Sequence, residues 1–347
     1  MIRFNCDYSE GAHPVILEKL AQTNLEQTPG YGQDPYCRQA AELIKTLCQT
    51  PQADVHFLCG GTQTNLTVIA AMLRPYQCVI SPDSGHINVH EAGAIEATGH
   101  RILAVPEENG KITAQQIARV CQAHWQDDNP EFAPQPKLVY LSFPTEYGTL
   151  YSKKELSDIR RVCDEHNLYL FMDGARLGYG LTAEGNDLTL PEIAACCDIF
   201  YIGGTKLGAL LGEAVVIVNP KLQKDFRYFM KQKGAILAKG RLLGIQFVGL
   251  LENGLYFKLA EHANKMAAMI RRACEEAGWK MWYDSPTNQQ FPVVPDDALK
   301  ELEQEYAFAH FKRLDRSHTA IRICTSWATR EEDVRQLIAD IKRVSAK

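Results

Sequence analysis

The stretch LYLFMDGAR, at residues 168–176, contains a run of five apolar residues that is followed directly by the polar residue Asp173. Apolar runs of about four to eight residues that end at glycine are typical of buried strands, so Leu168–Met172 is predicted to be a strand that ends at Asp173. A second run, Asp198–Ile202 (DIFYI), ends at two glycines shortly before Lys206. Strands of this kind that alternate with helical stretches predict an α/β domain with a mostly parallel sheet.

The alternation extends in both directions from this stretch. Further strands are predicted at Asp54–Cys59, Cys78–Ser81, Leu138–Phe143 and Ala214–Val218, and helices at Asn65–Leu73, His90–Thr98 and Lys153–His166. The link before Ala214–Val218 is too short for a helical crossover, which favours an antiparallel neighbour for that strand. Gln126–Pro136 contains three prolines and no periodicity, and is predicted to be a surface loop.

The pattern changes near Leu242, where a long helical region begins that continues towards Glu276. It is followed by an apolar segment, Ala320–Cys324, and by a final amphipathic helix that begins near Thr329. The sequence therefore predicts a large domain over residues 1–245 and a smaller C-terminal α+β domain over residues 246–347.

The composition is that of an ordinary globular chain of 347 residues, of which 46% are hydrophobic. Lys and Arg total 37 and Asp and Glu total 42, so the formal charge of −5 argues against nucleic-acid binding. No segment is apolar for long enough to predict a membrane span, and residues 1–14 lack the apolar stretch of a secretory signal. The eleven cysteines are an odd number, set mainly in apolar segments, which favours buried thiols in a reducing cytoplasm over a disulfide framework.

Polar residues follow the predicted strands at their carboxyl ends, where open α/β sheets bind ligands. They are the segment GGTQTN at residues 60–65, an imidazole at His86, a carboxylate at Asp173, a guanidinium at Arg176 and an amine at Lys206. Backbone N–H groups at a glycine-rich helix start bind phosphate, although the same segment also suits an ordinary capped turn. The set therefore predicts a ligand site at this edge of the sheet.

Asp173 and Lys206 are the most informative members of this set. A carboxylate directly after a buried strand is desolvated, and either a protonated pyridine nitrogen or a salt bridge with Arg176 would satisfy it. Lys206 lies among glycines and small residues that leave room for a bulky group, as a Schiff-base lysine requires, whereas a lone surface lysine is the ordinary alternative. Phosphate cradle, ring-nitrogen acid, stacking group and lysine are the four parts that a pyridoxal phosphate site needs.

His86 by itself suits either a ring-stacking base or a structural hydrogen bond. A metal site would use His86, His90 and Glu91, but their order is not His-Glu-x-x-His and no third ligand is spaced for it. The sequence therefore predicts no metal.

The residues at these positions resemble those of the threonine aldolases, which are pyridoxal phosphate enzymes of fold type I (aspartate-aminotransferase-like) in the wider β-eliminating lyase group. The resemblance covers nearly the whole chain. Its motifs are Tyr31-Gly32-Gln33-Asp34-Pro35, Gly60-Gly61-Thr62-Gln63-Thr64-Asn65, His86-Ile87-Asn88, Asp173-Gly174-Ala175-Arg176-Leu177, Gly204-Thr205-Lys206 and Arg322-Ile323-Cys324-Thr325-Ser326-Trp327. It implies a mostly parallel seven-stranded sheet, and an enzyme that cleaves β-hydroxy-α-amino acids such as L-threonine or L-allo-threonine to glycine and an aldehyde. A homodimer or homotetramer with active sites at the dimer interface is implied as well.

The resemblance also implies a role for each matching residue. Lys206 would bind the cofactor covalently, Asp173 would contact its ring nitrogen, and His86 would stack on the ring and assist proton transfer. Gly61 and Thr62 would hold the phosphate. Arg176 and Arg322 would hold the substrate carboxylate, and Tyr31 would reach a neighbouring subunit's site. In the family a basic segment also reaches a phosphate across the dimer, and the candidates here are Lys231, Lys239 and Arg241.

Two positions depart from the family pattern. Cys6 stands where many members have a serine that touches the substrate carboxylate. Thr145-Glu146-Tyr147-Gly148 stands where many have Glu-Asn-Thr-His, so the second histidine is missing and both the base and the preferred aldehyde stay open. β-Eliminating lyases and aminotransferases share the lysine, the acid and the cradle and are the alternatives, together with a non-catalytic protein of the same fold.

Overall fold

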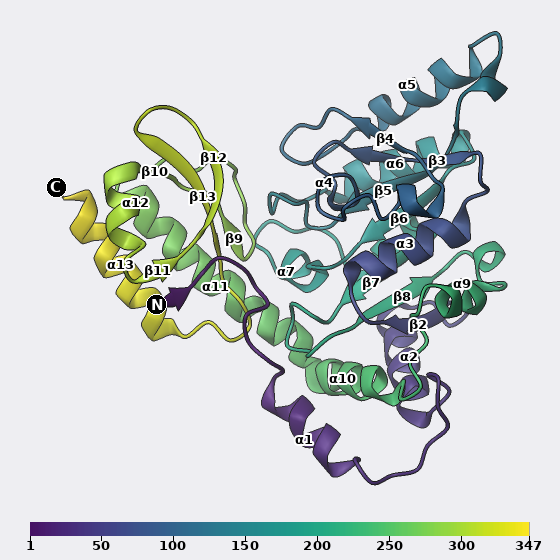
Figure 1. The fold of residues 1–347 in the computed structure, drawn as a ribbon, viewed down its shortest axis with the longest axis horizontal. Coiled ribbons are helices and arrows are strands. Elements are labelled where there is room, and N and C mark those ends of the chain that lie inside the picture. The colour runs from purple at the N-terminus through teal and green to yellow at the C-terminus, as the bar shows by residue number, and fades with distance from the viewer. Residues whose placement is uncertain (347) are drawn as a thin grey trace.

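The structure, a computed structural model, describes residues 1–346 and divides into a large α/β part and a smaller α+β part (Figure 1). The large part contains a seven-stranded sheet in the order β2-β8-β7-β6-β5-β3-β4. Its strands are β2 Asp54–Leu58, β3 Gln77–Pro82, β4 Ile102–Val105, β5 Gln135–Ser142, β6 Tyr169–Asp173, β7 Ile199–Gly203 and β8 Glu213–Ile217. Neighbouring strands from β7 to β4 are parallel, whereas β8 runs antiparallel to both of its neighbours. The predicted mostly parallel sheet and the antiparallel strand after Lys206 are therefore confirmed.

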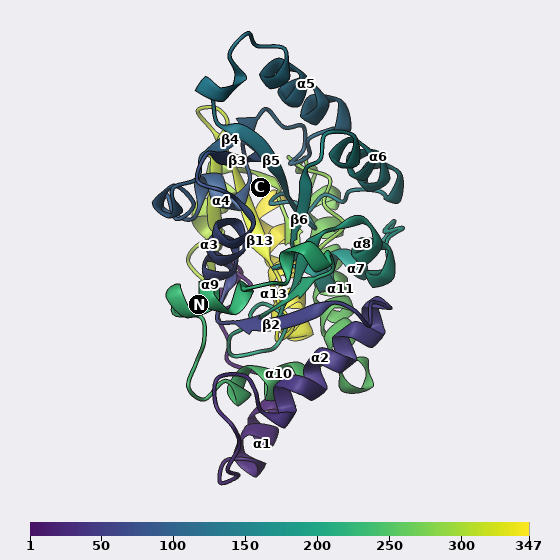
Figure 2. The ribbon, with the colours of Figure 1, turned by 90° about the vertical axis from the view of Figure 1, so that its right-hand side faces the viewer.

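Helices cover both faces of this sheet, which Figure 2 shows from the side. On one face lie α3 Gly61–Met72, α4 His86–Val89 and α9 Phe226–Gln232. On the other lie α2 Pro35–Cys48, α5 Ala114–Trp125, α6 Lys153–Glu165, α7 Leu177–Leu181, α8 Leu190–Cys196 and α10 Arg241–Leu251, and α1 Pro14–Gln22 packs against α10. Each face buries its own hydrophobic core, so the strand ends are held rigidly between two layers.

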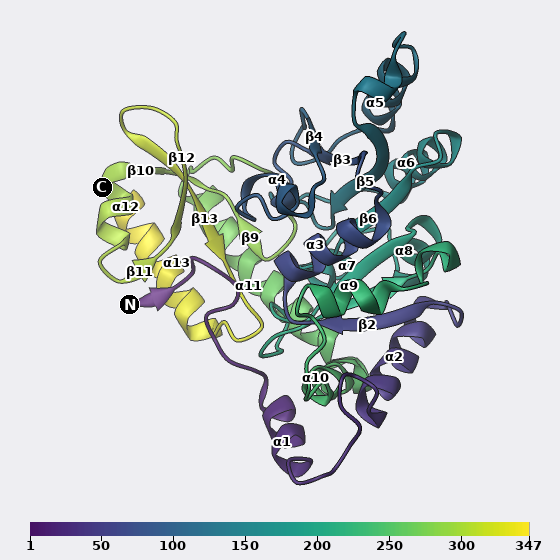
Figure 3. The same cartoon turned by 45° about the vertical axis from the view of Figure 1, so that its right-hand side comes forward.

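The small part is joined to the sheet by the 22-residue helix α11, Leu255–Glu276 (Figure 3). It contains β9 Gln289–Gln290, β10 Val293–Pro295, α12 Asp296–Leu302, β11 Tyr306–Ala307, β12 Ala309–Arg313, β13 His318–Cys324 and α13 Glu331–Ser345. β1, Ile2–Arg3, pairs in parallel with β11, so the start of the chain lies on the small part. The predicted domain boundary at residue 245 falls inside α10, and the division of the chain stays a prediction.

Two helix predictions were wrong for reasons that lie in the backbone. His90–Thr98 is not one helix, because Ala92 and Gly93 have positive φ angles of 51° and 73° and end any helical path after Glu91. The long helix expected from Leu242 is broken into α10 and α11 at Asn253 and Gly254, whose φ angles are 56° and 66°.

None of the helices formed by residues 1–346 combines the length and the apolarity needed to span a bilayer. None of the cysteines in the same residues forms a disulfide, and most of them are buried, as predicted.

Candidate active site

A pocket of about 300 Å³ opens at the carboxyl ends of the parallel strands, beside the start of α3. This is the edge at which open α/β sheets bind ligands. Six of the predicted site residues line it: Gly61, Thr62, His86, Asp173, Arg176 and Lys206. These residues come from positions 61 to 206 of the chain, so the sheet topology brings the predicted set together.

Asp173 ends β6 and is held by hydrogen bonds to both carboxylate oxygens. Tyr140 Oη donates to Oδ2 at 2.6 Å and Asn65 Nδ2 to the same oxygen at 3.0 Å, while Tyr201 Oη and the Ala175 amide donate to Oδ1. Burial alone raises the pKa of this carboxyl, but the charge of His86 and the hydrogen bonds outweigh burial, so the pKa of Asp173 lies below its ordinary value. The group is therefore a fixed, ionised acid in a buried place.

The glycine after Asp173 is required by packing. A Cβ at Gly174 would lie 1.8 Å from the carbonyl oxygen of Tyr201, so any larger residue would push the β6 turn away from β7. The close approach keeps the Tyr201 hydroxyl on the Asp173 carboxylate.

Lys206 follows β7 after Gly203-Gly204-Thr205 and is fully buried. Tyr179 Oη donates to its carbonyl oxygen at 2.6 Å, which fixes its backbone. Burial and then the charge of Arg176 lower the pKa of Lys206 below the ordinary lysine value. A lowered pKa leaves more of the amine neutral, which is the form that attacks a carbonyl carbon.

The start of α3 also lines the pocket. Gly60 is its N-cap, with an extended backbone (φ −174°) and no side-chain cap, so the first N–H groups of the 12-residue helix are not capped by a side chain. Gly61 and Thr62 line the pocket at this point. Helix N-termini of this kind bind phosphate through their N–H groups and dipole.

These groups fit pyridoxal phosphate in chemistry and in number. A buried amine, a buried ionised carboxylate and an uncapped helix start all face one pocket, and they suit the aldehyde, the ring nitrogen and the phosphate of that cofactor respectively. Among residues 1–346, no group of three or more His, Cys, Asp or Glu side chains could hold a metal ion.

His86 begins α4 and lines the pocket. Its Nδ1 lies 2.7 Å from Oε1 of the buried Glu91. Burial lowers the pKa of His86, but the Glu91 hydrogen bond and the charges of Glu146 and Asp173 raise it by more, so the net shift is upward.

Arg176 is paired inside the protein. Its Nε and Nη2 donate to the two carboxylate oxygens of Asp7 at 2.7 and 3.0 Å, and both side chains are buried. Two of its three nitrogens are thus engaged, and its role in holding a substrate carboxylate stays a prediction. Asp7 also accepts from Asn288 Nδ2 at 2.9 Å, so this pair ties the N-terminal segment to the small part.

Arg322 and Cys6 lie outside the residues that line the pocket. Arg322 projects from β13, where its Nη1 and Nη2 make only long hydrogen bonds, 3.5 Å to Gln289 Oε1 and 3.3 Å to Asn5 O. Its Nε is buried without a partner, so a further acceptor would complete the guanidinium. Cys6 Sγ lies 3.2 Å from Ser9 Oγ, and Cys6 directly precedes Asp7.

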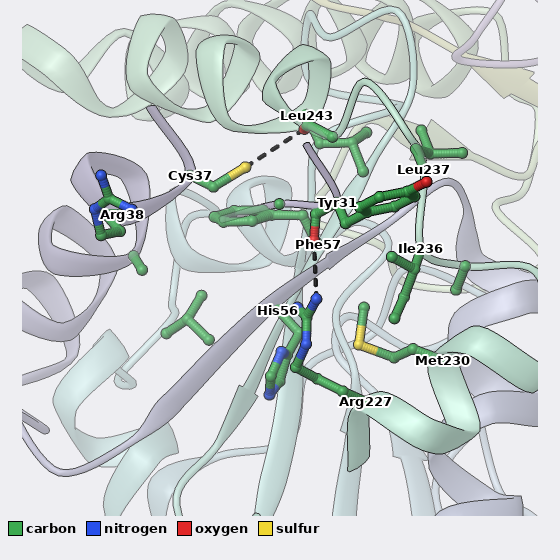
Figure 4. A pocket seen from close by; sticks show the side chains of 15 residues that line it. Tyr31, Cys37, Arg38, His56, Phe57, Arg227, Met230, Ile236, Leu237 and Leu243 are labelled. Carbon is green, nitrogen blue, oxygen red and sulfur yellow. Dashed lines mark hydrogen bonds between the residues drawn. The ribbon is translucent and has the colours of Figure 1, made fainter. Parts of the chain in front are cut away.

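Tyr31 does not line the pocket that contains Lys206 and instead lines a separate pocket (Figure 4). It is 52% exposed, Arg227 donates to its carbonyl oxygen at 3.0 Å, and Lys231 Nζ lies 5.2 Å from its ring centre. Of the other basic candidates, Arg241 is engaged by the carbonyl oxygens of Thr23 and Glu26. The predicted contact of Tyr31 with a neighbouring subunit stays a prediction.

Sequence reasoning missed several polar groups that complete the site. Tyr140 and Tyr201 look like core aromatics in apolar strands, and Asn65 looks like an ordinary residue of a helix, yet all three donate to Asp173. Glu213 also lines the pocket, where Thr205 Oγ1 donates to it at 2.8 Å, and burial raises its pKa well above the ordinary glutamate value. The signal for Glu213 was available, because it is the one charge in the apolar run 207–218.

Comparison with known proteins places the chain in a family. The model of the β-eliminating lyases matches residues 7–296. The chain is 31% identical to a low specificity L-threonine aldolase of Pseudomonas sp. (strain NCIMB 10558), over 99% of this chain and 97% of that protein.

Solved structures agree. A threonine aldolase of Leishmania major has a TM-score of 0.97 and 45% identity, over 99% of this chain and 100% of that one. A Thermus thermophilus aspartate aminotransferase mutant has a TM-score of 0.72 at 15% identity, over 99% and 91% of the two chains, and shows the fold alone. The predicted fold, that of the type I pyridoxal phosphate enzymes, is confirmed.

Proposed function

The chain belongs to the β-eliminating lyase family, within which its relatives are threonine aldolases, and we propose from this premise that its pocket cleaves β-hydroxy-α-amino acids. The enzyme is a pyridoxal-phosphate-dependent carbon–carbon lyase that acts on substrates such as L-threonine or L-allo-threonine and yields glycine and an aldehyde. The observation that carries the assignment is the meeting of Lys206, Asp173 and the start of α3 in one buried pocket.

Each of these groups has a task that its environment suits. Lys206 would attach the cofactor through its amine, Asp173 would hold the proton on the ring nitrogen, and the α3 N–H groups with Thr62 would hold the phosphate. When bound, pyridoxal phosphate accepts the electron pair of the broken Cα–Cβ bond into its protonated ring. The hydroxyls of Tyr140 and Tyr201, with the Asn65 amide, keep Asp173 ionised and in place for that task.

Substrate orientation and proton transfer fall to residues around the pocket mouth. Arg322, whose Nε is buried without a partner, binds the amino acid's carboxylate together with Arg176, which lines the pocket, and Cys6 assists them. His86 takes the proton of the β-hydroxyl through the ring edge that does not face Glu91, which is worth about 10²–10⁴-fold in rate. Glu146, to which Ser142 Oγ donates at 3.2 Å, lines the same pocket.

The test of this function is the product. The holoenzyme, given threonine, allo-threonine and phenylserine in turn, is expected to release glycine and the matching aldehyde in equal amounts. Serine and alanine with a keto-acid acceptor serve as controls. Formation of pyruvate or of a new amino acid in place of glycine would assign the chain to the β-eliminating lyases or the aminotransferases instead.

We further propose that the chain works in the cytoplasm as a homodimer or homotetramer that completes its sites between subunits. The support is Tyr31, which is exposed beside Lys231 and an apolar pocket away from its own Lys206 (Figure 4). Light scattering of the purified holoenzyme is expected to give two or four times the mass of one chain. A fully active enzyme with the mass of a single chain would contradict the shared site.

A further inference from the structure

Four polar side chains form one connected chain beside the pocket. Asn65 Nδ2 donates to Asp173 Oδ2 at 3.0 Å and to Glu91 Oε1 at 2.7 Å, and Glu91 Oε1 in turn lies 2.7 Å from His86 Nδ1. Asn65 belongs to α3 and His86 to α4, which lie on the same face of the sheet (Figure 2). The proposed base and the ring-nitrogen acid are therefore linked through only two intervening residues.

Glu91 is the least expected member of this chain. Its side chain is fully buried, and a buried carboxylate is stable only with hydrogen bonds and a cation nearby. Within residues 1–346 its ion pair is with His86, and its other oxygen, Oε2, is buried without a partner. The carboxylate of Glu91 therefore interacts with one charged partner, the imidazole ring of His86.

The backbone directly after Glu91 adopts an unfavourable conformation. Ala92 adopts a left-handed conformation with φ 51°, which is about 1–2 kcal/mol less favourable than a right-handed one for a residue with a Cβ. Gly93 follows with φ 73°. Strain of this kind persists where the surrounding structure fixes it, and it often marks functional sites.

The contact with Glu91 determines where the proton of His86 lies. Because Nδ1 faces a carboxylate oxygen, Nδ1 carries a hydrogen and Nε2, on the opposite edge, is the nitrogen left to exchange a proton with a ligand. The other titratable groups that act on this ring are Glu146, Asp173 and His90, whose ring centre lies 5.4 Å away. Burial works against the charged ring, and the hydrogen bond that His86 donates to Glu91 is the largest influence that favours it.

We propose that Glu91 is a positioning residue for His86: it orients the ring, fixes the hydrogen on Nδ1 and keeps Nε2 free to take the substrate's β-hydroxyl proton. The proposal rests on the proposed function for the identity of that proton. Nothing in it requires Glu91 to touch substrate or cofactor, since Oε1 contacts Asn65 and His86 and Oε2 is buried.

The variant Glu91→Gln keeps the shape of the side chain and removes its charge. Two readouts follow. In the apoprotein, NMR titration of the histidine rings, with His86→Asn identifying the His86 signal, is expected to show a lower pKa for His86. In the holoenzyme, kcat/KM for threonine is expected to fall about 10- to 100-fold, as expected for loss of one hydrogen bond to a charged group. The acid limb of its pH profile is expected to move to lower pH, because the pKa of His86 is lowered.

Asp198→Asn is the matched control. Asp198 accepts from Arg160 Nη1 and the Leu170 amide, both at 2.8 Å, at the opposite end of the sheet. It is expected to lower stability without moving the His86 titration or the pH profile. An unchanged His86 titration in Glu91→Gln, or an equal displacement in Asp198→Asn, would overturn the proposal.

Glu91→Asp covers the case in which the glutamine variant does not fold. It keeps the charge but shortens the side chain, so the His86 pKa is expected to fall below that of wild type, and kcat/KM to lie between the values of wild type and of His86→Asn. A wild-type titration combined with lost activity would contradict the positioning role. If the wild-type holoenzyme releases no glycine while Glu91→Gln still moves the apoprotein titration, the proposed function fails and the Glu91–His86 coupling stands.

Discussion

Replacing Lys206 with alanine is expected to lower turnover of threonine by about 10⁴- to 10⁶-fold, the scale on which removal of a covalent catalytic group acts. The physical reason is the place of the amine. It is buried, it lines the pocket, and its pKa is lowered by burial and by the charge of Arg176. No other lysine lines this pocket, within the described residues, so none can replace it.

The measurement is chemical labelling. Borohydride reduction of the holoenzyme, followed by peptide mapping, is expected to place the cofactor on Lys206 and to find no label in Lys206→Ala. Lys111→Ala is the control, because Lys111 is paired with Glu155 at 2.7 Å and does not line the pocket, so this variant should keep both the label on Lys206 and its turnover. A label on a different lysine in the wild type would refute the assignment of the site.

The strands and the residues at their ends could be predicted from the sequence because both depend on local chemistry. Leu168–Met172 and Asp198–Ile202 are apolar runs that glycine ends, and in parallel strands the polar residues that follow meet at one edge. Asp173 and Lys206 are in the pocket for this reason. The antiparallel direction of β8 could also be predicted, because the link between β7 and β8 is too short for a helical crossover.

Backbone breaks and buried partners could not be predicted in this way. Ala92 takes a left-handed conformation that its residue type disfavours, so the sequence pattern favoured a helix across it, and Glu91 was considered only as a metal ligand. The Asp7–Arg176 pair joins residues that are 169 positions apart, and no local pattern reports such a contact. Tyr140 and Tyr201 keep the period of apolar strands, so only the structure shows that their hydroxyls meet Asp173.

Replacing Asp173 with asparagine is expected to lower turnover by about 10³-fold, because a neutral amide cannot hold the ring nitrogen in its protonated form. The same substitution is also expected to lower the stability of the apoprotein. The Oδ2 atom accepts from Tyr140 and Asn65, and an amide nitrogen in its place would face the Asn65 donor. The free energy of unfolding is therefore expected to fall by about 1–3 kcal/mol at neutral pH.

The pH dependence of this loss separates the charge of Asp173 from its shape. Because the pKa of Asp173 is lower in the folded protein than in the unfolded chain, the carboxylate's contribution to stability is present above the ordinary aspartate pKa of about 3.9 and is lost as the pH falls through the folded value. Urea unfolding of wild type and Asp173→Asn should hence differ at pH 7 and converge in strong acid. Asp198→Asn, which removes another hydrogen-bonded carboxylate, should lower stability but leave the cofactor's ring chemistry intact. A constant difference between wild type and Asp173→Asn at every pH would mean that Asp173 contributes by packing alone, and an acid that merely packs could not keep a ring nitrogen protonated.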